Sequence, residues 1–211
     1  ALAAELYTQT ETVYQDIDAA DTNEIIVQKV FRNIMDGLQD TLKLLDYAAI
    51  ERAALLIRSA RRIAVYGFGN SATVCRDIET RFLRFGMVVQ AYSDAHQQAT
   101  SASLLTGKDV VIAVSHTGAT LELLDTVRTA RAAGAAVIII TSHVHSPLAK
   151  LGDIVLHGMG REVHYSSEAV SSRLIHMAIT DALYTAIAMQ SPKDYRRNLQ
   201  KMRAVIAKKR T

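Results

Sequence analysis

The sequence contains very little cysteine or proline and no tryptophan. Among its 211 residues there is one cysteine, Cys75, and there are two prolines. A lone cysteine excludes a disulfide within the chain, and we expect it to be a small buried residue of a protein in a reducing compartment, the cytoplasm. With 49% hydrophobic and 21% charged residues and no internal repeat, the composition is that of a globular protein.

Long apolar runs and a strong excess of either charge are also missing. The longest apolar run, residues 135–140, is far shorter than the ~20 residues that cross a bilayer. No signal-peptide pattern is visible near the start of the chain, so we expect no membrane partner. The formal net charge of +3 is too small to argue by itself for nucleic-acid binding.

The first part of the chain differs in pattern from the rest. Because the sequence begins at Ala1 without methionine, we expect a fragment, with residues 1–20 a linker and residues 21–211 the main domain. A helix is expected after a cap at residues 21–22, and Asp46 is expected to cap a second helix over residues 50–61. Apolar residues spaced three or four apart line one face of the first helix, which covers the sheet or contacts a partner chain: Ile26, Val30, Ile34, Leu38, Leu42 and Leu45.

From residue 62 onward, short apolar runs alternate with helical patterns. The runs are residues 63–66, 88–91, 110–114, 137–140 and 154–156, and the helical patterns are residues 72–85 and 121–133, with a short turn at 147–151. Two helices, residues 167–189 and 193–209, close the chain, and the helix dipole favours the cations near the end of the last one. This alternation predicts a three-layer α/β/α fold around a doubly wound, five-stranded parallel sheet.

The loop after the first strand, residues 67–71, reads Gly-Phe-Gly-Asn-Ser. Its glycines allow a ligand to approach the backbone closely, and Gly69, Asn70 and Ser71 stand where a helix start exposes free N–H groups. Such a turn favours an anion. The same segment also fits the G-x-G-x-x-A dinucleotide pattern, and Asp94 follows the second strand where a ribose-binding acid would lie.

The loop after the third strand carries three hydroxyls and a glycine within six residues. Ser115, His116, Thr117, Gly118 and Thr120 lie at the expected start of the next helix. A phosphate monoester carries a charge of about −1.5 to −2 and three strong acceptor oxygens, which hydroxyls and backbone N–H groups can satisfy without Lys or Arg. The alternative is a simple N-cap, which needs only one hydroxyl.

The strand order decides whether the two loops form one site. In a flavodoxin-like sheet of order 2-1-3-4-5, strands one and three are neighbours, and ligands bind beyond the carboxyl ends of the strands at that point. Both loops leave those ends. We expect this order and one shared pocket, although the sequence alone does not fix the order.

At these two loops the chain resembles a sugar isomerase (SIS) domain. The G-x-G-x-S segment at residues 67–71 and the S-x-T-G-x-T segment at 115–120 have the spacing of that family, and the Ser-Pro-Leu step at residues 146–148 resembles its loop after strand four. Residues 29–31, 94–97, 172–174 and 181–183 further resemble the RpiR-type regulators. Those proteins are similar in carrying a helix-turn-helix domain before the SIS domain, which implies that residues 1–6 are a remnant of it and that DNA binding requires the missing part.

The resemblance implies roles for particular residues. It implies phosphate binding by Ser71, Ser115, Thr117 and Thr120, and contact with the sugar by Glu168 and the loop at 142–146. Sugar contacts are therefore expected from Ser142, His143, Ser146, His164 and Glu168. It also implies a homodimer or a dimer of dimers, and neither a cofactor nor a metal.

Three classes of function remain open at this point. In isomerases of this family a glutamate matching Glu168 moves a proton between C1 and C2, and His116, His143, His145 or His164 could open the sugar ring or shuttle a proton. A dinucleotide-binding protein would use the first loop but leave the second unused. We expect instead the phosphosugar-sensing part of a bacterial transcription regulator of carbohydrate metabolism, because the long helical lead-in suits a regulator.

Overall fold

The computed structural model describes residues 17–159 and 170–209. Within them, five parallel strands form one sheet of order β2-β1-β3-β4-β5. The strands are β1 (Arg62–Tyr66), β2 (Val89–Tyr92), β3 (Asp109–Ser115), β4 (Ala136–Thr141) and β5 (Ile154–His157). The predicted fold and strand order are confirmed.

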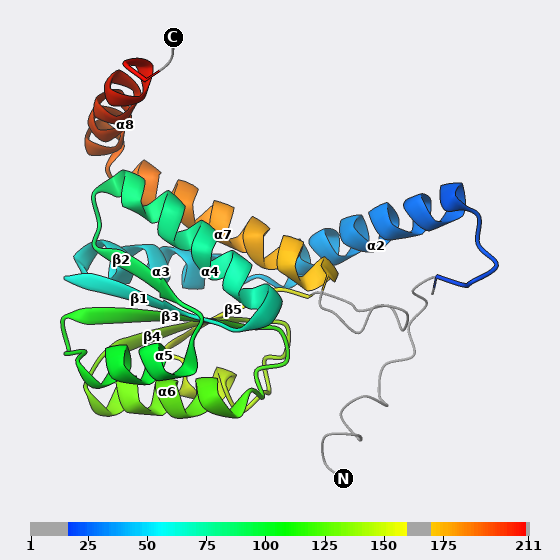
Figure 1. Ribbon diagram of the computed structural model, residues 1–211, viewed down its shortest axis with the longest axis horizontal. Helices are drawn as coiled ribbons and strands as arrows, with labels where there is room; N and C mark the ends of the chain where they lie inside the picture. The colour runs from blue at the N-terminus through cyan, green and yellow to red at the C-terminus, as the bar shows by residue number, and fades with distance from the viewer. Residues whose placement is uncertain (1–16, 160–169, 210–211) are drawn as a thin grey trace.

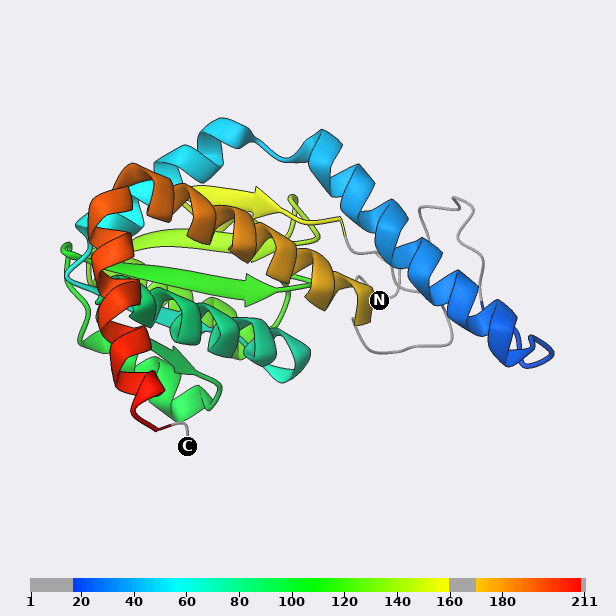
Figure 2. The same ribbon diagram turned by 90° about the horizontal axis from the view of Figure 1, so that it is seen from above.

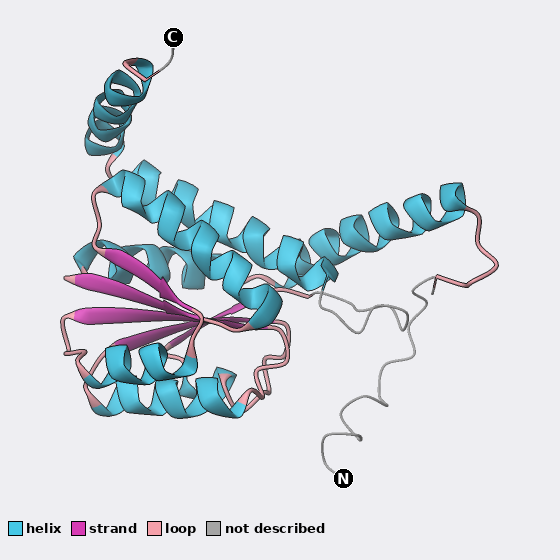
Figure 3. Cartoon of the chain, in the orientation of Figure 1, coloured by secondary structure: helices cyan, strands magenta, loops and turns pink. Residues whose placement is uncertain are grey.

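Helices cover both faces of the sheet (Figure 1, Figure 3). Because side chains alternate along a strand, Ile63 and Val65 face one core cluster while Ala64 and Tyr66 face the other. The first cluster is closed by α3 (Tyr47–Ser59), α4 (Gly69–Phe82) and α7 (Val170–Gln190), and the second by α5 (Ala95–Ser103) and α6 (Leu121–Ala132). Burial on both faces explains why the strands are continuously apolar.

Helix α5 was not predicted from the sequence. It reads AHQQATSAS, and its buried residues are Gln98, Ser101 and Ala102, so no row of large apolar residues marks it. Asp94 begins this helix, and its carboxylate accepts a hydrogen bond from the Gln97 N–H at 2.9 Å. The acid that fitted a ribose-binding position therefore serves as a helix cap.

Helix α2 (Asn23–Leu44) forms an arm that extends from the body (Figure 2). Thr22 caps it, as expected, but its buried residues are Asn33, Gly37 and Thr41, not the predicted apolar face. This side contacts α7: a Cβ added to Gly37 would lie 2.6 Å from Cδ1 of Ile175. Of the two alternatives for the apolar face, packing on the sheet is not observed, because the arm reaches the body through small and polar residues, and contact with a partner chain stays a prediction.

Other boundaries differ by a few residues. Helix α3 begins directly after its cap, Asp46, and α4 begins at Gly69 and continues as the 3₁₀ turn η1 (Leu83–Phe85). The turn predicted at 147–151 is η2 (Ala149–Leu151), and α8 (Pro192–Ala207) ends the described chain. Within the described residues no helix is long and apolar enough to cross a membrane.

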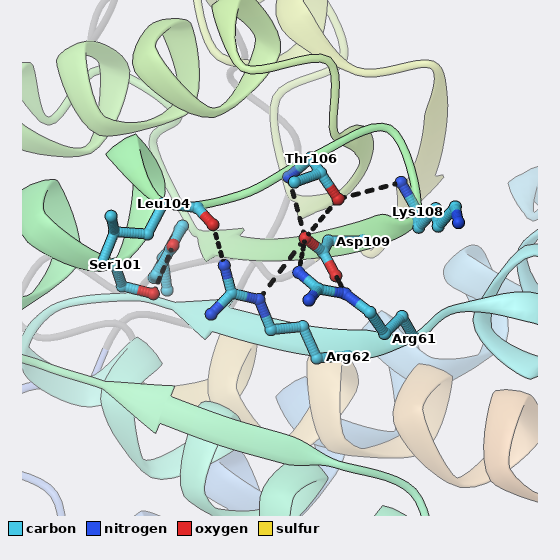
Figure 4. Close-up of polar contacts among 8 residues, drawn as sticks. Arg61, Arg62, Ser101, Leu104, Thr106, Lys108 and Asp109 are labelled. Atoms are coloured by element: carbon cyan, nitrogen blue, oxygen red, sulfur yellow. Dashed lines mark hydrogen bonds and ion pairs between the residues drawn. The ribbon is translucent and has the colours of Figure 1, made fainter.

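A buried carboxylate, Asp109, joins the amino-terminal ends of β1 and β3 (Figure 4). Asp109 is 1% exposed and accepts two hydrogen bonds from Arg61, at 3.0 and 2.8 Å, and two from Thr106. Arg62 also lies against it. Burial alone would raise the pKa of Asp109. The hydrogen bonds and the charge of Arg62 outweigh this effect and lower the pKa to about 2. The cluster secures the edge opposite the two glycine- and serine-bearing loops.

Candidate functional site at the carboxyl ends of the strands

The two predicted loops lie side by side. Strands β1 and β3 are paired, with Tyr66 opposite Ala113, so the loops that follow leave neighbouring points of one edge. Gly67 permits this packing, because a Cβ there would lie 2.7 Å from Sγ of Cys75 and 3.1 Å from the carbonyl oxygen of Val114. The expected strand order and the neighbouring positions of the two loops are confirmed, and the pocket shared by both loops stays a prediction.

The first loop turns directly into α4. Gly69 has a φ of +52°, in the left-handed region that glycine adopts readily, and it is exposed. Asn70 and Ser71 follow in the first turn of the helix and are half-buried. The N–H of Ser71 already donates to the carbonyl of Phe68 at 3.0 Å, so the free N–H groups expected here belong to residues before it. The Ser71 hydroxyl thus stands at the N-terminal end of α4.

The second loop is shaped by local hydrogen bonds. Ser115 is buried, and its hydroxyl oxygen accepts from the Gly118 N–H at 3.0 Å, while Thr117 is exposed and accepts from the Ala119 N–H at 3.3 Å. Gly118 has a φ of +62°, and a Cβ there would lie 2.2 Å from Oγ of Ser146. This glycine allows the loops after β3 and β4 to touch, which brings a third loop to the site.

Two of the helices that begin at the site, α4 and α6, lack side-chain caps. Helices α2, α3 and α5 are each capped by a side chain, from Thr22, Asp46 and Asp94. Helix α4 follows Phe68, and α6 follows Thr120, whose hydroxyl makes no capping hydrogen bond. Helix α8, which begins away from the site, also starts without a side-chain cap, with Pro192 at its first position. Two uncapped helix starts at one edge form a place where an anion is stabilised.

The loop after β4 is fixed against the second loop. Ser142 donates its N–H to the carbonyl of His116, at 3.2 Å, and Nδ1 of His143 contacts the same oxygen at 2.9 Å. Ser146 is buried, and its hydroxyl accepts from the Ala149 N–H at 3.2 Å. The structure therefore places Ser142 and His143 beside the second loop, while Ser146 supports the turn that follows.

Two residues of α7 join these loops and were not predicted as site residues. Oγ of Ser172 lies 2.7 Å from Nδ1 of His116, and Nε2 of His176 lies 3.1 Å from Oγ of Ser142. Both α7 residues are buried, at 0% and 1% exposure. They are four residues apart, so they share one face of the helix, and this spacing is the signal that the sequence offered.

Two buried histidines at this end of the sheet, His116 and His176, have pKa values low enough to keep them neutral at pH 7. Burial and, to a smaller extent, the nearby His143 together lower the pKa of His116 to about 4. Burial, with smaller effects of His116 and His157, lowers the pKa of His176 to about 3. The loops at 67–71, 115–120 and 141–148 contain no Lys or Arg. An anion at these three loops would meet neutral hydroxyls and N–H groups at helix starts, and no cationic side chain of the loops themselves.

Other features complete the picture. A cavity of about 310 Å³ lies beside the first loop, between α4 and the end of β2, and its walls include Gly69, Thr73 and Tyr92. Two predicted sugar contacts, His164 and Glu168, lie outside the described residues. Within residues 17–159 and 170–209, no group of three His, Cys, Asp or Glu side chains could hold a metal ion.

Comparison with protein families identifies the class of this fold and site. Residues 56–186 match the SIS domain model, which spans the sheet and most of the helices around it. The chain therefore carries a SIS domain.

Individual relatives narrow the class further. The chain is 33% identical over 201 residues to the HTH-type transcriptional regulator RpiR of Escherichia coli strain K12, covering 95% of this chain and 68% of that protein. It belongs to the RpiR-type transcription regulators, and its relatives point to a regulatory and not an enzymatic role. The isomerase interpretation is accordingly not favoured.

Solved structures agree with this assignment. The Vibrio vulnificus NanR protein complexed with ManNAc-6P is 27% identical, with a TM-score of 0.82 over 88% of this chain and 71% of NanR. The sugar isomerase domain of an RpiR transcription factor from Sphaerobacter thermophilus is 25% identical, with a TM-score of 0.77 over 85% of this chain and 98% of that domain.

Proposed function

We propose that this chain is the effector-binding part of a bacterial regulator of carbohydrate metabolism, and that its effector is a phosphorylated sugar. The observation that carries the proposal is the pair of uncapped helix starts of α4 and α6. These two helices follow the neighbouring strands β1 and β3 along the chain. A phosphate at their meeting point supplies the acceptors that side chains supply at α2, α3 and α5. The NanR complex supports the choice of ligand, since ManNAc-6P is a phosphosugar.

The proposed phosphate contacts are the hydroxyls of Ser71, Ser115, Thr117 and Thr120, with backbone N–H groups near Gly69, Asn70 and Gly118. Hydrogen bonds to a charged group contribute roughly 1.5–3 kcal/mol each, so four or five suffice to anchor a small ligand without a cation. The sugar contacts are Ser142, His143 and Ser146, together with His164 and Glu168. The sequence also placed His116 among the phosphate contacts; we assign it instead to orienting the second loop through its contact with Ser172.

The rest of the regulator is proposed from the family. Residues 1–20 form a linker and the remnant of an upstream helix-turn-helix domain, residues 21–211 form the phosphosugar-binding domain, and the full protein binds operator DNA in the cytoplasm. A homodimer or dimer of dimers is proposed to pair through α2, whose exposed side carries Val27, Phe31 and Met35. The effector acts by binding the two arrangements of that assembly with different affinity.

A thermal-shift panel followed by calorimetry tests the ligand. The panel contains amino-sugar, aldose, ketose and sugar-acid phosphates, each beside its unphosphorylated parent, with NAD as a further probe. We expect at least one phosphosugar to raise the melting temperature while its parent sugar does not. Failure of every phosphosugar to bind at millimolar concentration would contradict the proposal. Stabilisation by NAD alone would show instead that the chain binds dinucleotides.

A further inference from the structure

The charge of this chain is concentrated at its C-terminal end. Residues 191–211 contain eight Lys and Arg residues and one acid, Asp194, whereas the whole chain contains 24 and 21. The preceding 190 residues therefore contain 16 cations and 20 acids, and they are net negative. The formal net charge of +3 is therefore the sum of a basic C-terminal segment and a net negative remainder of the chain.

Contacts on one side of α8 determine which side faces solvent. The Tyr195 ring packs on Phe85 with ring centroids 5.6 Å apart, and its hydroxyl lies 3.1 Å from that of Tyr184. Asn198 donates to the carbonyl of Phe85 at 3.0 Å. The cations of the helix lie away from these contacts, and all of them are exposed: Lys193, Arg196, Arg197, Lys201 and Arg203.

Neither the helix dipole nor ion pairing explains this basic face. Lys193, Arg196 and Arg197 lie in the first two turns, where a cation is disfavoured, and the last turn holds no cation. The dipole argument made from the sequence concerned only the cations near the C-terminal end of this helix, so it does not account for the cations in the first two turns. Among the described residues, Arg197 pairs with Asp194 at 2.7 Å, and no ion pair neutralises Lys201 or Arg203.

We propose that the exposed face of α8 binds the phosphate backbone of duplex DNA without reading its sequence. The five cations lie on one face of α8 between Lys193 and Arg203, over about 15 Å of helix, which matches the rise of about four base pairs. A membrane fits less well, because a helix that lies in a bilayer needs its apolar face free, and Tyr195 is already packed on the body. Helix α8 projects from the opposite end of the molecule to α2 (Figure 1).

Binding of the 211-residue chain to a fluorescent 20-base-pair duplex of arbitrary sequence, followed by anisotropy, tests the proposal. We expect measurable affinity at 50 mM salt and about 100-fold weaker binding at 200 mM, the change for release of counterions from about four phosphates. The test variant is Arg196→Glu, Lys201→Glu and Arg203→Glu combined. The matched control is Lys108→Glu, Arg128→Glu and Lys150→Glu, which makes the same change in net charge at exposed positions on the body.

We expect the α8 variant to lose at least tenfold in affinity and the body variant to stay within about threefold of the parent chain. Absence of DNA binding by the parent chain, or equal losses in both variants, would overturn the proposal. Binding to vesicles containing phosphatidylserine but not to DNA would assign the face to lipid and overturn it as well. Phosphosugar binding, measured on the same samples, is expected to be unchanged, so this result and the ligand assignment can fail independently.

Discussion

The serine at the end of β3 has two uses for its hydroxyl. Ser115 is buried and accepts the Gly118 N–H, which holds the second loop in its turn. The hydroxyl can at the same time donate its proton outward, as a serine has one donor and two acceptor sites. Shape and ligand binding therefore depend on the same atom, and a variant at this position tests the placement of the phosphate.

We predict that Ser115→Ala weakens phosphosugar binding by roughly 1–3 kcal/mol, about 5- to 150-fold in Kd, because one hydrogen bond to a charged group is lost. Calorimetry with the phosphosugar found in the panel gives the number. Ser103→Ala, an exposed serine at the far end of α5, is the control and should leave Kd unchanged. Equal affinity of Ser115→Ala and the parent chain, with the same melting temperature, would show that the phosphate lies elsewhere.

The residue types of the sequence located the two loops, but not the α7 side chains that contact them. The hydroxyls and glycines of residues 67–71 and 115–120 were visible because they interrupt apolar strand patterns. Ser172 and His176 were not, since they lie on a helix about 55 residues further along and reach the loops only through the packing of α7. Contacts of this kind depend on tertiary structure, which a single sequence does not encode in its local pattern.

At the scale of elements, strands were easier to predict than helices. The central strands β1, β3 and β4 are buried on both faces and read as apolar runs, and the bounds of all five strands differ from the expected ones by at most one residue. Helix α5 buries Gln98 and Ser101 and has no apolar periodicity to find. The arm α2 has such periodicity, but its apolar side is not the side that contacts the body.

The exposed stripe on α2 has the spacing of a helix that pairs with another. Phe31, Met35, Leu38 and Leu42 are separated by four, three and four residues, and their exposures are 64%, 54%, 36% and 62%. A stripe of this kind in contact with water is unfavourable. Pairing two copies of the arm removes it from water, and Gly37 and Thr41 on the other side remain bound to the body.

We predict that Phe31→Glu combined with Leu42→Glu converts a dimer of this chain to a monomer. Each substitution places a charge in the middle of the paired stripe, and the dissociation constant should rise at least 100-fold. Light scattering after size exclusion measures the mass. The control is Gln28→Glu with Gln39→Glu, which adds the same charge to exposed positions flanking the stripe. If the parent chain is monomeric, or the stripe variant stays dimeric, the arm is not the interface.

For the molecule as a whole, acid weakens the interactions at the two ends of the strands in different pH ranges. At the edge carrying the candidate site, His116 and His176 are neutral when folded, with pKa values of about 4 and about 3, whereas an unfolded histidine titrates near 6.5. Below pH ~6.5 the unfolded chain binds more protons, so their contribution to stability falls as the pH drops. At the other edge Asp109, with a pKa of about 2, keeps its contribution until the pH falls below about 4.

We predict that the free energy of unfolding, measured with urea, falls by roughly 2–4 kcal/mol between pH 7.5 and pH 5, and that His176 accounts for up to about 2 kcal/mol of that fall. His176→Gln should therefore show a smaller difference between the two pH values, whatever it costs at pH 7.5, because glutamine does not titrate. His145→Gln, at an exposed histidine, should retain the full difference.

Asp109→Asn tests the other edge. It should lower stability by roughly 2–3 kcal/mol at both pH values, since it leaves Arg61 and Arg62 without their buried partner while Asp109 is ionised throughout this range. Its difference between pH 7.5 and pH 5 should equal that of the parent chain. A pH dependence that disappears in Asp109→Asn and persists in His176→Gln would reverse the assignment and place the acid-sensitive contacts at the edge away from the site.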